Sequence, residues 1–97
     1  MALEHNEQPN PPISKFESML KTDDVYFFDA EDFEEIIHHY LNIGKISLGK
    51  KAIQIGLEQH PNSLELKLLQ VEVLTFEDKY EAAEKLLDEI QRIDTHN

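Results

Sequence analysis

Apolar residues recur three or four positions apart through most of this chain, with polar residues between them, and this is the pattern of amphipathic helices. In one such segment, Phe33, Ile37 and Tyr40 share a helical face. The pattern predicts a short N-terminal helix over residues 14–22 and longer helices over residues 30–43, 45–59 and 79–93, and it leaves residues 64–76 open between a helix and a strand. We therefore expect an all-α fold, with residues 1–13 as a flexible tail and residues 14–97 as one helical domain.

Start and stop signals flank these segments. Four polar residues are expected N-caps, each with an acidic residue three positions later: Ser14, Asp29, Asn62 and Asp78. Phe28 and Phe33 stand at the spacing of a hydrophobic staple. Gly44 is expected to end a helix in the left-handed conformation, and the pair His60 and Pro61 to end the next one.

The connector over residues 23–29 is more apolar than its position suggests. Its Val25-Tyr26-Phe27-Phe28 run has four apolar side chains in a row. Loops between helices are usually rich in polar residues, glycine and proline. We therefore expect this run to pack onto the helices.

Residues 30–63 carry the most specific pattern in the chain. Aromatic, aliphatic and small residues stand there at the offsets of a 34-residue helix–turn–helix repeat, namely Phe33, Ile36, Ile37, Tyr40, Gly44, Gly49, Ile53, Gly56 and Pro61. The stretch resembles a tetratricopeptide repeat (TPR) of the bacterial type. The resemblance implies a short α-solenoid of antiparallel helix pairs, in which Gly49 and Gly56 lie where neighbouring helices approach closely.

A shift of 34 residues places a second, weaker unit over residues 64–97, so the resemblance covers about two units. Ala83 then takes the place of Gly49, whereas Ile90 takes the small-residue place of Gly56. Repeat proteins generally need three or more units to bury a continuous core. Either the N-terminal helix caps the array, or the chain is part of a longer repeat protein, or it self-associates.

The segment 64–76 reads as a strand when its period is taken alone, because Leu64, Leu66 and Leu68 alternate with polar residues. The repeat register instead assigns it to the first helix of the second unit, and a helix is our prediction. Such a helix is apolar on nearly every side, and one neighbouring helix pair cannot cover all of this apolar surface. This favours further units or self-association.

The composition of the chain limits the classes of molecule that it is expected to bind. Twenty acidic and nine basic residues give a net charge of −11, which repels nucleic acid and anionic membranes and favours a cationic protein or peptide. The basic cluster Lys45, Lys50 and Lys51 is interpreted as a solvated helix face. The chain has no cysteine, no apolar run of the roughly 20 residues that span a bilayer, and no secretory signal pattern. We expect a cytoplasmic protein.

No constellation of residues in the sequence indicates catalysis or a cofactor. His38 and His39 are adjacent, so they point about 100° apart on a helix and do not share one metal ion easily. The acidic run from Asp23 to Glu35 lacks the glycine and the alternating oxygen ligands of an EF-hand. We expect no enzyme activity, no metal and no cofactor.

The TPR resemblance implies that the first helix of each unit lines a concave groove. By register, the groove would be formed by Glu31, Glu34, His38, Leu41, Asn42, Glu65, Leu68, Glu72, Thr75 and Phe76. The family's clamp for a C-terminal carboxylate does not carry over, because Glu34 and His38 stand where its cationic and amide side chains begin. The expected function is an interaction module or scaffold whose acidic groove binds a basic or amphipathic segment. The alternative is a capping or oligomerising segment of a longer repeat protein.

Overall fold

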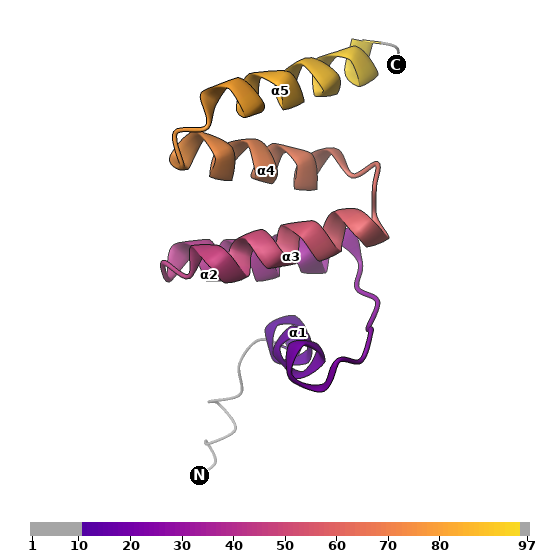
Figure 1. Cartoon of the computed structure of the whole chain (residues 1–97). Coiled ribbons are helices and arrows are strands. Elements are labelled where there is room, and N and C mark those ends of the chain that lie inside the picture. Colours follow the sequence, from indigo (N-terminus) through magenta and orange to yellow (C-terminus); the bar gives the residue numbers. More distant parts are fainter. Residues whose placement is uncertain (1–10, 96–97) are drawn as a thin grey trace.

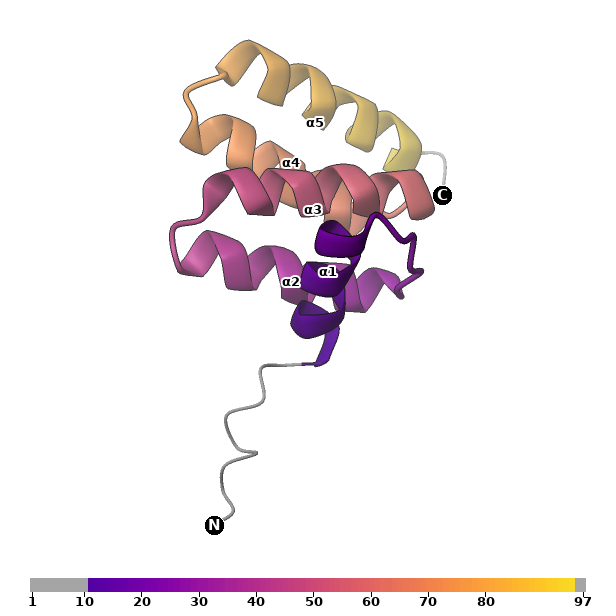
Figure 2. The ribbon, with the colours of Figure 1, turned by 60° about the horizontal axis from the view of Figure 1, so that its bottom comes forward.

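The computed structural model describes residues 11–95, and all regular structure within that range is helical. Five helices follow one another along the chain: α1 (Pro11–Thr22), α2 (Ala30–Asn42), α3 (Ile46–Gln59), α4 (Leu64–Phe76) and α5 (Tyr80–Thr95). The helices α2 and α3 form one antiparallel pair, α4 and α5 form a second pair stacked on it, and α1 crosses the other side of α2 (Figures 1 and 2). The predicted fold class, all-α with antiparallel helix pairs, is confirmed, and the strand alternative for residues 64–76 is excluded.

The first helix begins three residues earlier than predicted, so the expected N-cap at Ser14 is wrong. Prolines are tolerated in the first turn of a helix, because their missing N–H has no intrahelical partner there and their φ is already helical. Pro11 and Pro12 stand in that turn, and Ile13 behind them is buried. Residues 11–13 therefore belong to the helical domain, while the rest of the predicted tail, residues 1–10, lies outside the described residues.

Two further N-caps also differ from prediction. Asp29 is the N-cap of α2 as expected, with an extended backbone. The cap of α4 is Ser63, not Asn62: the Ser63 side-chain oxygen accepts a hydrogen bond of 3.2 Å from the backbone N–H of Leu66. Asp78 does not cap α5, because it adopts a left-handed conformation (φ 63°) directly after α4. A polar residue between two helices can either end the first helix or cap the second, and the sequence pattern alone does not distinguish these two roles.

The turn inside each helix pair has the same hydrogen bonds. The N–H of Lys45 donates to the C=O of Tyr40 across the α2–α3 turn at 2.8 Å, and the N–H of Lys79 donates to the C=O of Leu74 across the α4–α5 turn, also at 2.8 Å. This six-to-one bond defines the Schellman motif, which ends a helix on a left-handed residue. That residue is Gly44 in the first pair (φ 79°), as predicted. The helix α4 also begins and ends 34 residues after α2.

Two glycines of α3 lie at close contacts with neighbouring helices. A Cβ atom on Gly49 would lie 2.8 Å from a methyl carbon of Leu41 on α2. A Cβ atom on Gly56 would lie 3.1 Å from both Leu66 on α4 and Phe33 on α2. Gly56 therefore marks the point where three helices meet, and the predicted contact role of both glycines is confirmed.

The core continues from these contacts to α1. Phe16 of α1 is fully buried, with its ring centroid 6.0 Å from that of Tyr40 and 6.3 Å from that of Phe28. The predicted staple is confirmed, because the rings of Phe28 and Phe33 lie edge to face at 5.2 Å. The Tyr40 hydroxyl donates to Glu17 of α1 at 2.9 Å. Burial, and then this bond to a carboxylate, raises the pKa of Tyr40 well above its ordinary value.

The helix α5 lies at the far end of the stack from α1 (Figure 1). By Cα–Cα distances of 8 Å or less, α5 approaches α4 and no other helix in residues 11–95. Ala83 and Ile90 are its buried residues, at the places that Gly49 and Gly56 hold in α3. Within the described range, no helix combines the length and apolar character needed to cross a bilayer.

Candidate functional site

The ten predicted groove residues lie on two neighbouring helices, five on α2 and five on α4, and four of them line one hollow. This hollow has a volume of about 400 Å³ and is formed by Leu41, Ile46, Glu72, Val73, Thr75 and Phe76. We call it the α2–α4 hollow. It combines residues of both units, as the predicted groove requires.

The walls of the α2–α4 hollow are mostly apolar. Val73 is buried and forms part of the floor, and Leu41 is half-buried. Phe76, the last residue of α4, is 72% exposed, although burying a phenylalanine side chain is worth about 2 kcal/mol or more. The hydroxyl of Thr75 donates to the C=O of Val71 at 2.9 Å, so this polar group is satisfied by its own helix. The hollow thus presents an aromatic ring and aliphatic walls to a ligand.

The charge at this hollow is negative. Glu72 is exposed at its rim and has the single ionisable side chain among its lining residues. Glu34 and Glu31 do not line the hollow, but they add negative charge on the same helix toward its start, where Glu34 is half-buried and Glu31 is exposed. A cationic side chain next to an apolar anchor would match this arrangement better than an anionic one.

The remaining predicted groove residues do not line the α2–α4 hollow. Glu65 lines a different hollow, of about 620 Å³, beside the α3–α4 turn at the other end of α4. The other five are Glu31, Glu34, His38, Asn42 and Leu68, of which Leu68 is 42% exposed. The predicted groove is therefore a long face of two helices with its apolar hollow at one end.

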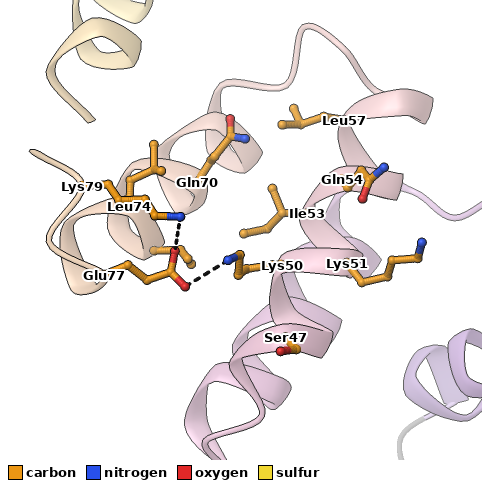
Figure 3. Close-up of a pocket in the computed structure, with 11 residues that line it drawn as sticks. Ser47, Lys50, Lys51, Ile53, Gln54, Leu57, Gln70, Leu74, Glu77 and Lys79 are labelled. Atoms are coloured by element: carbon orange, nitrogen blue, oxygen red, sulfur yellow. Dashed lines mark hydrogen bonds and ion pairs between the residues drawn. The ribbon is translucent and has the colours of Figure 1, made fainter. Parts of the chain in front are cut away.

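A second hollow, of about 550 Å³, lies between α3 and α4 and was not predicted (Figure 3). Its walls include Ile53 and Leu57 of α3 and Leu74 of α4, and an ion pair closes one end. The carboxylate of Glu77 lies 3.0 Å from the ammonium of Lys50 and 3.5 Å from that of Lys79. These contacts, the hydrogen bond from Lys50 first, hold the pKa of Glu77 below its ordinary value.

This ion pair corrects one interpretation of the sequence. Lys50 is not only part of a solvated basic face, because its ammonium joins α3 to the residue that ends α4. Lys50 and Glu77 are far apart in sequence, and neither stands in a motif, so no local signal identifies the pair. The Oε1 atom of Glu77 is buried and accepts no hydrogen bond, so only the 3.5 Å ion pair to Lys79 compensates it. Because the two ammonium groups already neutralise the Glu77 carboxylate, this hollow offers less to a cationic ligand than the α2–α4 hollow does.

The connector before α2 is a third feature that the sequence showed only in part. Tyr26 and Phe28 pack onto the helices as expected, whereas Val25 is 73% exposed and Phe27 is 75% exposed. The expectation that the whole apolar run packs down is therefore wrong for these two residues. Alternate residues of an extended segment point to opposite sides, so the helices cover one side of the run.

The adjacent histidines occupy different surroundings. His38 is exposed, and the ring of His39 lies edge to face against that of Tyr40, with centroids 5.2 Å apart. Among residues 11–95, no group of three or more His, Cys, Asp or Glu side chains is arranged to hold a metal ion.

Comparisons of the chain with protein-family models, with curated proteins and with solved structures found no match. The functional argument therefore depends on the surface of the molecule itself.

Proposed function

We propose that this chain is a protein–protein interaction module of the TPR type, whose α2–α4 face binds a basic or amphipathic segment of another protein. The observation that carries the proposal is the α2–α4 hollow, which is lined by the exposed side chains of both Phe76 and Glu72. Exposed aromatic groups in a concave, partly apolar setting are typical anchors for a partner.

The repeat geometry supports the TPR part of the proposal. The bounds of α2 and α4 differ by 34 residues, and both pairs turn through the same six-to-one hydrogen bond. Small residues occupy the helix contacts at Gly49, Gly56 and Ala83. In such repeats, stacked pairs present an extended binding surface, and no catalytic residue or cofactor is required.

Charge supports the class of partner. The net charge of −11 attracts a cationic segment at long range, before the two molecules touch. In the complex, the contact itself is made with apolar side chains. An amphipathic helix with lysine or arginine on one face and leucine on the other satisfies both requirements. A cytoplasmic location fits this role, because the sequence contains no cysteine.

The test uses a fluorescent synthetic peptide of leucine and lysine at helical spacing, with binding followed by fluorescence anisotropy. The double variant Glu34→Lys with Glu72→Lys should bind roughly tenfold more weakly or worse, because two repulsive charges replace two attractive ones. The matched control is Glu84→Lys with Glu89→Lys, exposed residues on α5 that change the net charge equally.

The control should retain most of the affinity, and circular dichroism should show unchanged helicity in both variants. An equal loss of binding in the two variants would mean that only the net charge matters. The proposed face would then be wrong.

One observation favours the second candidate function, a capping or oligomerising segment. Among the helices of residues 11–95, α5 packs on α4 alone, and it leaves Tyr80, Leu87 and Ile93 exposed by 57%, 37% and 51%. Such a face fits a second copy or a further helix pair. A mass that rises with concentration in light scattering, and that falls to the monomer in Leu87→Gln, would support this candidate. A monomer at all concentrations would contradict self-association.

A further inference from the structure

In the connector over residues 23–29, the backbone groups of Tyr26 and Phe28 have hydrogen-bond partners, and the N–H of Tyr26 donates to the sulfur of Met19 at 3.3 Å. The side chain of Gln59 donates from Nε2 to the C=O of Tyr26 at 2.7 Å, and its Oε1 accepts from the N–H of Phe28 at 3.1 Å. The Nε2 atom of His60 lies 2.6 Å from the C=O of Phe28. The end of α3 thus pairs with the connector much as a neighbouring strand would.

The other edge of the connector has no such partner. Within residues 11–95, neither Val25 nor Phe27 makes a hydrogen bond through its backbone N–H or C=O. Successive residues of an extended chain direct their backbone N–H and C=O groups to opposite edges. Because the C=O of Tyr26 and the N–H of Phe28 face Gln59, the backbone groups of Val25 and Phe27 face the other edge. Their side chains are also the most exposed large apolar ones in the described chain.

A hollow of about 650 Å³ borders this segment, between the end of α1 and α3. Leu20 and Ile55 contribute half-buried apolar walls to it. Three carboxylates line the hollow, those of Asp23, Asp24 and Glu58, against the one ammonium of Lys51. The surface is therefore apolar in its walls and acidic at its rim.

We infer that the connector is a second docking surface, where an extended basic segment of another protein binds by adding a strand to the open edge at Val25 and Phe27. The added backbone would pair with these two residues, as in other strand-addition complexes. An apolar side chain of the segment enters the hollow, and a neighbouring lysine or arginine meets the carboxylates of Asp23 and Asp24.

Other occupants fit this surface less well. A helix uses its backbone groups internally and leaves the open edge unpaired. A second copy would bring the same carboxylates against one another. The first ten residues of the chain contain two glutamates and no lysine or arginine, so they do not supply the basic side chains.

The site is separate from the α2–α4 hollow, because the two hollows share no lining residue. Leu41 and Ile46 of the α2–α4 hollow flank the α2–α3 turn. That turn and the connector lie at opposite ends of the α2–α3 pair (Figure 1). The inference therefore stands or falls independently of the proposed function. Variants in one hollow serve as controls for the other.

A random peptide library displayed on phage, selected against the whole chain, provides the probe. We expect the enriched peptides to alternate apolar and basic residues, and a synthetic peptide of that sequence to lose roughly tenfold or more in affinity for Val25→Ser with Phe27→Ser. Phe76→Ala should bind it as the unchanged chain does. No enrichment, enrichment of acidic peptides, or equal binding to the Val25 and Phe27 variant would overturn the inference.

Amide hydrogen exchange, followed by NMR on the unchanged chain, gives a readout that requires no variant. When the peptide binds, exchange at the amides of Val25 and Phe27 should slow, whereas the already bonded amide of Phe28 should change little. Slowing at Phe28 alone, slowing spread over α5, or a doubling of molecular mass would each contradict strand addition.

Discussion

Gly44 and Asp78 stand 34 residues apart, and both end a helix in the left-handed conformation, with φ of 79° and 63°. The same turn is therefore made once with a residue that favours this backbone and once with a residue that does not. The Asp78 turn is held in addition by the Tyr80 hydroxyl, which donates to the Asp78 carboxylate at 2.7 Å. Because the two positions are equivalent, the free-energy cost of the left-handed conformation can be compared between them.

Exchanging the residue types at these two positions should have opposite effects. Asp78→Gly should raise the free energy of unfolding by less than the roughly 1–2 kcal/mol that the left-handed conformation costs a residue with a Cβ, because the exposed hydrogen bond from Tyr80 is lost with the carboxylate. Gly44→Ala should lower it by about 1 kcal/mol; a Cβ there would have no atom within 4 Å, so only the backbone contributes. Urea denaturation of the two variants measures both effects, and two shifts of the same sign would contradict the assignment of equivalent turns.

The two buried glycines should respond differently to alanine. Leu41, which faces Gly49, is half-buried and can move its methyl group, so Gly49→Ala should change the free energy of unfolding by about 0.5 kcal/mol or less. Phe33 and Leu66, which face Gly56, are fully buried, so Gly56→Ala should destabilise by about 1–2 kcal/mol after the gain in helix propensity. Chemical denaturation gives both values, and a Gly56→Ala variant as stable as the unchanged chain would show that the three-helix contact is loose.

The buried hydroxyl of Tyr40 predicts a loss of stability at high pH. The pKa of Tyr40 is raised in the folded state above its ordinary value of about 10. The protonated hydroxyl therefore stabilises the fold fully below about pH 10, and this contribution is lost as the pH rises through the pKa of the folded state. Tyr40→Phe should cost about 1 kcal/mol at neutral pH through the lost hydrogen bond to Glu17. Above pH 10 the variant should lose less stability than the unchanged chain. Parallel stability profiles for the two proteins between neutral and high pH would disprove this.

The ion pair at Glu77 predicts a smaller effect at low pH. The Glu77 pKa is lowered in the folded state by Lys50, so its contribution is present above about pH 4.5 and is lost as the pH falls below that value. Because the pair is partly exposed, added salt should weaken the contribution. Glu77→Gln should therefore lower the melting temperature slightly at neutral pH and low salt, and have no effect at high salt. A salt-independent effect would indicate that Glu77 acts through packing.

The sequence predicted the helices better than their ends. Residues 64–76 form a helix although Leu64, Leu66 and Leu68 alternate as in a strand. The residues that the helix buries are Leu66, Leu69 and Val73, which lie on one helical face, so packing outweighs the local period. The stop at Gly44 was predictable, since glycine favours the left-handed conformation. The caps at Ser14, Asn62 and Asp78 were wrong, because each has a polar or proline neighbour that competes for the same role.

The candidate site was predictable only in part. Register placed Leu41, Glu72, Thr75 and Phe76 on facing helices, and these four residues do meet in one hollow. The pair of Lys50 and Glu77 and the pairing of Gln59 with the connector depend on how the helices cross, which helical periodicity does not determine. The exposure of Val25 and Phe27 depends on that same pairing, because Gln59 fixes which edge of the connector faces outward.

The most direct test of the central claim is an NMR titration of the isotope-labelled chain with the leucine–lysine peptide. The account predicts saturable shifts of the backbone signals of Leu41, Glu72 and Phe76, and in Glu34→Lys with Glu72→Lys the shifts of Leu41 and Phe76 should require roughly tenfold more peptide or more. Shifts confined to α5, or no shifts at millimolar peptide, would contradict the claim that the face between α2 and α4 binds a basic amphipathic segment.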